Sequence, residues 1–367
     1  MVGNCYVFQP TDEWNRPIES DPVDFQSDCI LDRMAAQVAS GDASRGYATM
    51  MVRLDVGTMT QDTYGMRYNL FTAASPAHTP ITYGTDGENY SDESDWFDAQ
   101  GVLRSGAPGV PAFFPFPAGM AIEGWGGTTA TDPSGGDRHI IVVDGVACRL
   151  YESWNTVRLA NGYQASNTAA WDMALGNNQR PAGWTSGDAA GMAIFPGVLR
   201  YSEVASGSIP HALRFTAPMA QNAYASPGRH LGPSGNRDVT LPFYGARFRL
   251  KASFDASGYS ADTQVLIEAL KKYGLIFADQ GTGAYVTGDN DPGFDVDMLA
   301  ELNQGNAGPA SKRIPFDKDH WELVQNPNAV TRGFNPGTIS CNGVTTNANP
   351  AWQPNWTPSC PPMANWP

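Results

Sequence analysis

Residues 136–152 carry the densest group of chemically useful side chains, because acids and an imidazole flank two β-branched runs. The dipeptide Asp144-Gly145 between those runs predicts a β-hairpin with a two-residue turn. In that register Asp137 faces Glu152, and His139 lies on the same, otherwise apolar, face. Charged groups on such a face are costly unless they are paired or used. The full expected register pairs Val143 with Val146, Ile141 with Cys148 and His139 with Leu150.

A glycoside hydrolase needs two carboxyl groups, one protonated and one ionised, so a pair of acids on one face is compatible with this chemistry. Repulsion between Asp137 and Glu152 would raise the pKa of one of them. Asp188 and Glu203 are the alternative partners for such a pair. The competing interpretation is a polar cluster at a sheet rim, with the acids bound to arginines.

The loop around residues 178–191 places Trp184 close to Asp188, and an aromatic face beside a carboxylate suits a sugar. Trp154 is a second stacking candidate. Basic side chains would hold polar or carboxylated substituents through charge-assisted hydrogen bonds, and the candidates are Arg229, Arg249 and Lys251. Each of these residues also has a structural interpretation, as a core plug or an ion-pair partner.

Two patterns could bind metal ions, so a transition metal and calcium are both candidate cofactors. Three histidines in the strand-rich centre, His139, His211 and His230, could converge on a transition metal, although their spacing matches no local motif. Oxygen ligands alternate around a glycine in residues 289–297, as they do in calcium loops. The calcium candidates are Asp289, Asp291 and Asp295. The alternatives are hydrogen-bonded core histidines and a solvated acidic turn.

The composition of this 367-residue chain favours short strands joined by turns, because it has 39 Gly, 28 Pro and only 16% charged residues. A formal net charge of −14 leaves no basic footprint for a nucleic acid, so we expect none as a partner. No run of 18 apolar residues is present, which predicts no membrane span. Acidic chains rich in Asn, Thr, Gly and Trp are typical of extracellular proteins, so we expect secretion and the removal of a leader.

We therefore expect a mainly β fold, a jelly-roll-type β-sandwich with a few flanking helices. Residues 1–332 would form a single sandwich domain, wrapped by its N-terminal segment. Residues 333–367 would form a Pro/Asn/Trp-rich tail, where a disulfide between Cys341 and Cys360 would help most. Cys148 lies on the apolar face of the hairpin and could remain a buried free thiol.

Helix and strand patterns outside the hairpin fill in this fold. Ser27 could cap a helix over 28–38, and Ser260 could cap a second helix over 261–273 that ends at Gly274. Alternation predicts strands, and Leu275–Ala278 and Ala284–Thr287 look like a strand pair. The other expected strands cover residues 209–216 and 247–254.

Several segments together resemble a family of uncharacterised secreted proteins of bacteria and fungi. They include the motifs GDRH, LYE, RPAGWTS, HALRFT and RFRLKAS, which begin at Gly136, Leu150, Arg180, His211 and Arg247. The resemblance covers most of residues 1–300. It implies that Cys5 and Cys148 pair, and it implies a polysaccharide context, because members of the family are often attached to carbohydrate-binding modules.

These observations favour a secreted carbohydrate-active enzyme, a glycoside hydrolase that acts on a polysaccharide or oligosaccharide. The catalytic candidates are Asp137, Glu152, His139, Asp188 and Glu203. One alternative is a three-histidine, metal-dependent oxidative enzyme or lyase acting on polysaccharide. The other is a non-catalytic glycan-binding or surface-assembly protein.

Overall fold

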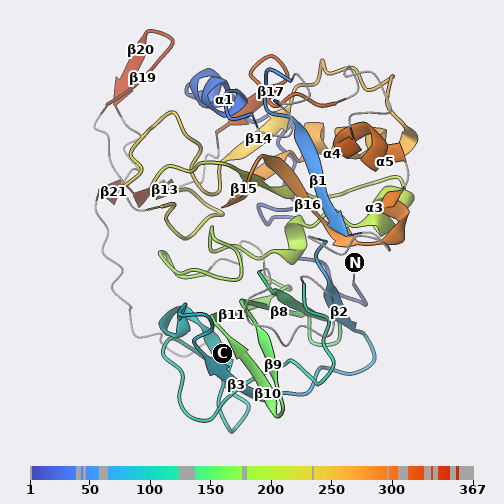
Figure 1. Cartoon of the computed structure of the whole chain (residues 1–367), viewed down its shortest axis with the longest axis vertical. Helices are drawn as coiled ribbons and strands as arrows, with labels where there is room; N and C mark the ends of the chain where they lie inside the picture. Colours follow the sequence, from blue (N-terminus) through green and yellow to red (C-terminus); the bar gives the residue numbers. More distant parts are fainter. Residues whose placement is uncertain are drawn as a thin grey trace.

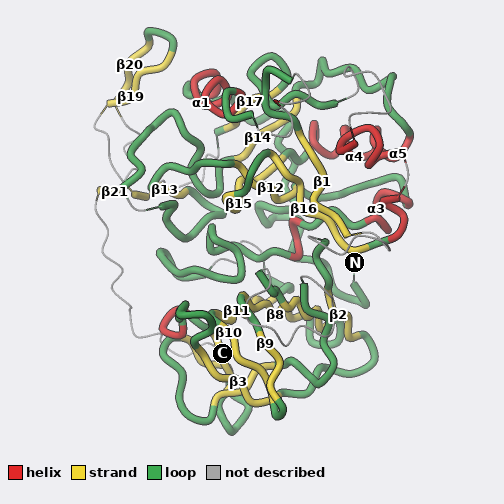
Figure 2. Tube along the Cα trace, viewed as in Figure 1, coloured by secondary structure: helices red, strands yellow, loops and turns green. Residues whose placement is uncertain are grey.

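The computed structural model describes most of the chain, and all structural statements below concern these residues. They are residues 2–38, 43, 47–57, 65–123, 137–175, 180–233, 235–295, 297–304, 313–325, 332–333, 338–347 and 353–354. Within them the chain is mainly β with few helices, as the composition predicts. Long irregular connections join the strands (Figure 2).

One mixed sheet of six strands forms the upper region in Figure 1, in the order β1-β16-β12-β15-β14-β17. The pairs β1–β16 and β12–β15 are parallel, and the pairs β16–β12, β15–β14 and β14–β17 are antiparallel. The strands are β1 (Val52–Gly57), β12 (Leu213–Ala217), β14 (Arg247–Leu250), β15 (Leu275–Gln280), β16 (Ala284–Asn290) and β17 (Trp321–Val324).

The helices accompany this upper sheet (Figure 1). Its apolar face shares one core with α1 and α4, and Phe215, Phe248 and Phe277 lie at the centre of that core. The α-helices are α1 (Ser27–Ala35), α3 (Tyr201–Ala205), α4 (Ala261–Lys272) and α5 (Asp297–Leu299). Shorter 3₁₀ and π turns cover Ser91–Glu93, Phe195–Gly197, Pro292–Asp295 and Ala300–Gln304.

Two sheets make up the lower region, and their facing apolar side chains form a second core. The first has the order β11-β8-β7-β2, and the second has the order β5-β4-β6-β3-β10-β9. Their strands are β2 (Tyr68–Phe71), β3 (Thr79–Tyr83), β4 (Asp95–Phe97), β5 (Leu103–Ser105), β6 (Ala112–Phe114), β7 (Ile140–Asp144), β8 (Arg149–Trp154), β9 (Val157–Leu159), β10 (Gly162–Ala165) and β11 (Asn167–Asp172).

Strand β7 links the two cores, because both of its faces are covered. Ile140 and Val142 point into the lower core, whereas Ile141 and Val143 point into the upper one. This explains its continuous β-branched run, since a strand buried on both sides has no polar face.

Short strands complete the structure beside the upper region. They are β13 (Ala223–Tyr224), β18 (Arg332–Gly333) and β21 (Gln353–Pro354) in one sheet, and β19 (Thr338–Cys341) and β20 (Val344–Asn347) in a hairpin. Among the described residues, no helix has the length and apolar character that crossing a bilayer requires.

The jelly-roll connectivity is not confirmed, although paired β-sheets with few helices match the expected class. Jelly rolls are built from antiparallel Greek keys, whereas β1–β16, β2–β7, β3–β10 and β12–β15 are parallel pairs. The expected direct pairing of residues 275–278 with residues 284–287 is wrong, because β12 lies between β15 and β16.

The predicted hairpin exists as β7 and β8, but its register is wrong by four residues. Val143 faces Leu150, and Ile141 faces Glu152. The loop is longer because the Asp144 carboxylate accepts the backbone N–H groups of Val146 and Ala147, each at 3.0 Å. A shift by an even number preserves the faces, so His139 and Glu152 still share the side expected of them.

The two helices predicted from their caps differ in outcome. Ser260 caps α4 as expected, since its side chain accepts the Thr263 N–H. Helix α1 begins one residue earlier than predicted and has no side-chain cap. The Ser27 hydroxyl instead accepts the Leu323 N–H of β17 at 2.9 Å, which ties the helix to the sheet.

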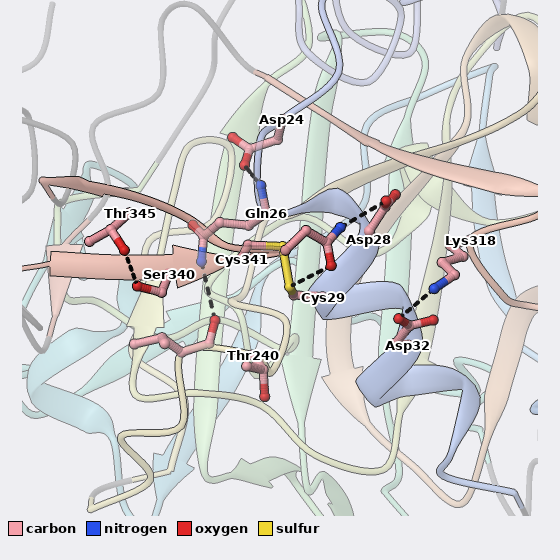
Figure 3. The surroundings of a disulfide bond; sticks show 12 residues. Asp24, Gln26, Asp28, Cys29, Asp32, Thr240, Lys318, Ser340, Cys341 and Thr345 are labelled. Carbon is pink, nitrogen blue, oxygen red and sulfur yellow. Dashed lines mark hydrogen bonds and ion pairs between the residues drawn. A yellow bond between two sulfur atoms is a disulfide. The ribbon is translucent and has the colours of Figure 1, made fainter.

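Two disulfides join distant parts of the chain. Cys5 pairs with Cys148, as the family resemblance implies, so Cys148 is not a free thiol. The expected Cys341–Cys360 bond is wrong, because Cys341 pairs with Cys29 of α1 (Figure 3). The nearby Asn342 side chain donates to Asp28 at 3.1 Å, so the β19–β20 hairpin is fastened to the N-terminal helix. Cys360 lies outside the described residues.

Candidate active site

The upper sheet presents a polar face, made mainly by alternate residues of β1, β16 and β12. The intervening side chains, such as Leu54 and Phe215, are buried in the core. Strand β15 adds Asp279, which follows four buried residues at a bulge in its pairing with β12. Register places two rows across this polar face. One row contains Arg53, Tyr285, Thr216 and Asp279, and the other contains Asp55, Thr287 and Arg214.

Arg214 lies at the centre of this face, with its side chain only 4% exposed. Its guanidinium donates to the Thr287 hydroxyl at 2.7 Å and to Asp188 at 3.4 Å. The Asp279 carboxylate lies 4.0 Å away and is 34% exposed, so it connects the buried arginine to solvent. Arg214 therefore anchors two carboxylates of unequal burial.

Asp55 occupies the same polar face at the β1 end and is half-buried. Burial raises the pKa of this carboxyl to about 7, the negative charges of Glu123 and Asp137 add to the shift, and Arg214 opposes it. A carboxyl of this kind keeps its proton close to neutrality while remaining within reach of solvent. That combination is what a general acid needs.

The other carboxyls beside Arg214 show the same tendency. Burial raises the pKa of Asp188, which Arg214 partly counteracts. Burial and the charge of Asp188 raise the pKa of Asp279. Asp137 is exposed, and its charge acts on both Asp55 and Asp279. We call Arg214 with these five acids the Arg214 cluster: Asp55, Glu123, Asp137, Asp188 and Asp279.

His139 borders this cluster through Glu123, with which it forms a buried pair. The Nδ1 atom of His139 contacts the Glu123 carboxylate, and Nε2 lies 2.8 Å from the carbonyl oxygen of Gly187. Burial opposes the positive charge, but the neighbouring charge of Glu123 outweighs it and raises the pKa of His139 to about 9. His139 is therefore an imidazolium at neutral pH.

Glu152 is placed as a structural group, and the expected Asp137–Glu152 pair is wrong. In the observed register Glu152 lies opposite Ile141, and Asp137 precedes the strand. The completely buried Glu152 carboxylate accepts the backbone N–H groups of Ile194 and Phe195, each at 2.8 Å. Burial raises the pKa of Glu152 to about 7.

Glu203 belongs to a separate group, which we call the Glu203 cluster: Arg200, Glu203 and His211. Arg200 donates to Glu203 at 2.7 Å, and the His211 Nε2 atom lies 2.9 Å from the same carboxylate. Burial would raise the pKa of Glu203, but the charges of His211 and Arg200 prevail and lower it to about 2. Its two partners therefore hold Glu203 as an ionised carboxylate.

The predicted sugar-binding residues have other partners. Trp184 is buried under the Arg180 guanidinium, 5.4 Å from the ring centroid, and Trp154 packs near Tyr90. The Arg249 guanidinium pairs with Glu322 of the adjacent strand at 2.6 Å. Lys251 donates to the Lys318 carbonyl at 2.6 Å, and Arg229 donates to the Arg180 carbonyl at 2.7 Å. The structural interpretation is favoured for each of them.

The predicted three-histidine metal set is not brought together. His211 bonds within the Glu203 cluster, and His230 contacts the Ala189 carbonyl at 3.2 Å, so neither shares a partner with His139. Among the described side chains, no group of three His, Cys, Asp or Glu residues is arranged to hold a metal ion.

The predicted calcium loop is likewise not formed by the side chains that are described. Asp289 accepts the Tyr201 N–H at 3.2 Å, and Asp291 accepts the Gly293 N–H at 2.8 Å. Asp291 therefore stabilises its own turn, whereas Asp289 holds the first residue of α3. The side chain of Asp295 lies outside the described parts of the chain.

Sequence reasoning found Asp137, Asp188 and His139 but missed Asp55, Asp279 and Arg214. The missing signal was the polar half of each alternating strand. The segments Arg53-Leu54-Asp55, Leu213-Arg214-Phe215 and Tyr285-Val286-Thr287 all alternate with period two. A charged residue repeated at the polar positions of such segments marks a shared polar surface once the strands are adjacent.

No known protein family model matches this chain, and no curated protein or solved structure resembles it significantly.

Proposed function

We propose that this chain is a secreted carbohydrate-active enzyme, a glycoside hydrolase whose reacting carboxyls belong to the Arg214 cluster. Asp55 would protonate the leaving-group oxygen of the glycosidic bond, and Asp137 would supply the ionised carboxylate. The observation that supports this assignment best is the half-buried position of Asp55 on the polar face, in the row of Thr287 and Arg214, where burial raises its pKa to about 7 although Arg214 opposes the shift.

The surroundings of Asp55 suit a polyhydroxylated substrate. Tyr285 and Thr216 are partly exposed on the same face, and the Tyr285 ring lies 6.0 Å from the Arg53 guanidinium. An aromatic ring can stack on a sugar, and a carboxylate beside it can accept hydrogen bonds from the sugar hydroxyls. Asp279 would take the second of these roles.

Two disulfides are compatible with an oxidising, extracellular setting, because such bonds persist there and are rare in the cytosol. This agrees with the secretion expected from composition.

The test is a polysaccharide panel assayed by reducing-end release, with and without chelator, for wild type and two variants. We expect chelator-resistant turnover on at least one glycan, loss of that turnover in Asp137→Asn, and retention in Glu203→Gln. Equal activity in all three proteins would contradict the assignment. Glycan binding without turnover, unchanged in Asp137→Asn, would assign the chain to non-catalytic glycan recognition instead.

A further inference from the structure

The segment that carries Asp188 is tied to the lower region through one imidazole. His139 stands immediately before β7, and its Nε2 atom lies 2.8 Å from the carbonyl oxygen of Gly187, the residue next to Asp188. Its Nδ1 atom contacts Glu123, whose own backbone N–H donates to the His139 carbonyl at 2.9 Å. The imidazole thus bridges a carboxylate and a carbonyl.

Both partners of the ring can only accept hydrogen bonds. A carbonyl oxygen has no proton to give, and an ionised carboxylate has none either. Each ring nitrogen must then carry a proton for both bonds to exist, which makes His139 an imidazolium. Deprotonation at Nε2 would turn the bond to Gly187 into a contact between two lone pairs.

Asp188 depends on the placement of this segment. Its N–H donates to the Ser186 hydroxyl at 2.9 Å, and that hydroxyl also donates to the Met192 carbonyl at 2.6 Å. These hydrogen bonds fix the shape of the turn, so a displacement of Gly187 would also displace Asp188. Asp188 in turn receives the Arg214 guanidinium at 3.4 Å.

We propose that His139, as an imidazolium paired with Glu123, is a positioning residue that holds Gly187 and so fixes the Asp188 carboxylate against Arg214. The catalytic consequence rests on the proposed function, since Arg214 orients the site carboxyls. The tether itself is a property of the folded chain and is testable without a substrate.

Other charged groups act on His139 from each element packed around it. Glu123 and Asp137 precede β7, Glu152 belongs to β8, and Asp188 and Arg214 complete the surroundings. Four of these five groups are acids, but only Glu123 contacts the ring directly. Replacing Glu123 with glutamine therefore keeps an acceptor for Nδ1 and removes the charge that most favours the second proton.

Hydrogen exchange of peptides covering residues 184–191 tests the tether in wild type, Glu123→Gln and Glu203→Gln. The last variant is a matched control, because Glu203 also pairs with a buried histidine but lies outside the Arg214 cluster. At pH 8.5 we expect exchange about 10-fold faster in Glu123→Gln than in wild type, as for the loss of one charge-assisted hydrogen bond. Lowering the pH to 5.5 should restore protection, because it reprotonates the ring.

The proposal would be overturned if Glu123→Gln and wild type showed the same protection of this peptide at both pH values. It would also be overturned if Glu203→Gln accelerated exchange as much as Glu123→Gln. If Glu123→Gln does not fold, ¹⁵N shifts of the His139 ring in wild type decide the question. At pH 7 we expect both nitrogens to carry protons, and a neutral tautomer would refute the proposal. Because neither readout uses a glycan, a negative polysaccharide panel with a positive exchange result would reject the proposed function alone.

Discussion

The Arg214 cluster and the Glu203 cluster use the same residue types with opposite results. In the Glu203 cluster one acid meets an arginine and a histidine, and its pKa falls to about 2. In the Arg214 cluster, burial raises the pKa of Asp55 to about 7, and the charges of Glu123 and Asp137 add to the shift. At Glu203 the charged partners outweigh burial, whereas at Asp55 burial and the neighbouring acids outweigh Arg214 and leave a carboxyl group with a proton to donate.

Solvent access also separates the two clusters. Asp279 is 34% exposed and Asp137 is exposed, so the Arg214 cluster opens outward from a buried arginine. The Glu203 side chain is 21% exposed, and its partners His211 and Arg200 are only 4% and 8% exposed. A carboxyl group that has a raised pKa and is accessible to solvent is the better candidate for a catalytic acid.

The largest expected difference between the clusters concerns turnover. Asp55→Asn should lower kcat on any glycan that the panel identifies by about 10²- to 10⁴-fold, because it removes the general acid. Glu203→Gln should change kcat by less than about 3-fold, because Glu203 touches no part of the site. Reducing-end assays on both purified variants check this, and a similar loss in the two variants would erase the distinction.

Glu152 belongs to neither kind of carboxyl. Its pKa is raised like that of Asp55, but its side chain has no access to solvent. Glu152→Ala should lower the free energy of unfolding by about 3 kcal/mol, since it strips two buried N–H groups of their acceptor and leaves a cavity. Urea denaturation measures this loss. The milder Glu152→Gln should retain turnover per folded molecule, and its complete inactivity would move Glu152 into the active site.

The Glu203 cluster should stabilise the fold in a pH window set by its lowered pKa. Its contribution is present above the ordinary pKa of 4.5 and disappears as the pH falls toward about 2. Glu203→Gln should therefore cost about 2 kcal/mol at pH 7, and the difference from wild type should shrink below pH 4. Urea titrations at pH 7, 4 and 3 test this, and a difference that is constant with pH would show that Glu203 is not ionically held.

The smallest expected effect has the opposite sign and belongs to Asp55. A raised pKa means that the folded state disfavours the ionised form, so this carboxyl destabilises the fold increasingly as pH rises from 3.8 to about 7. Asp55→Asn should raise stability at pH 8 by about 1 kcal/mol, a value limited by solvent screening. Thermal melts at pH 5 and 8 would reveal the gain, and a loss of stability at pH 8 would place Asp55 in a stabilising ion pair.

Much of the fold follows from local sequence, whereas its long-range organisation does not. The Ser260 cap of α4 and the two-sided burial of β7 both have short-range signals. The Cys29–Cys341 bond joins residues 312 positions apart, and no local pattern chooses that partner over Cys360. The loop after Asp144 is longer than two residues because the Asp144 side chain accepts two backbone N–H groups. These side-chain hydrogen bonds compete with the two-residue turn, and the Asp-Gly dipeptide alone does not predict which of the two forms.

The candidate site divides in the same way. Asp137 and His139 stood out because polar groups interrupted an apolar run. Asp55 and Arg214 come from β1 and β12, which flank β16 in the sheet, and only the strand order brings them to one face. Strand order depends on parallel crossover pairings, which the sequence pattern does not encode locally.

Carboxyl ¹³C NMR titration of the folded protein tests most directly whether the two clusters differ as described. We expect Asp55 to titrate near pH 7 and Glu203 near pH 2 in the same sample. A midpoint for Asp55 close to the ordinary value of 3.8 would contradict the central claim, because no protonated acid would then face the substrate at neutral pH.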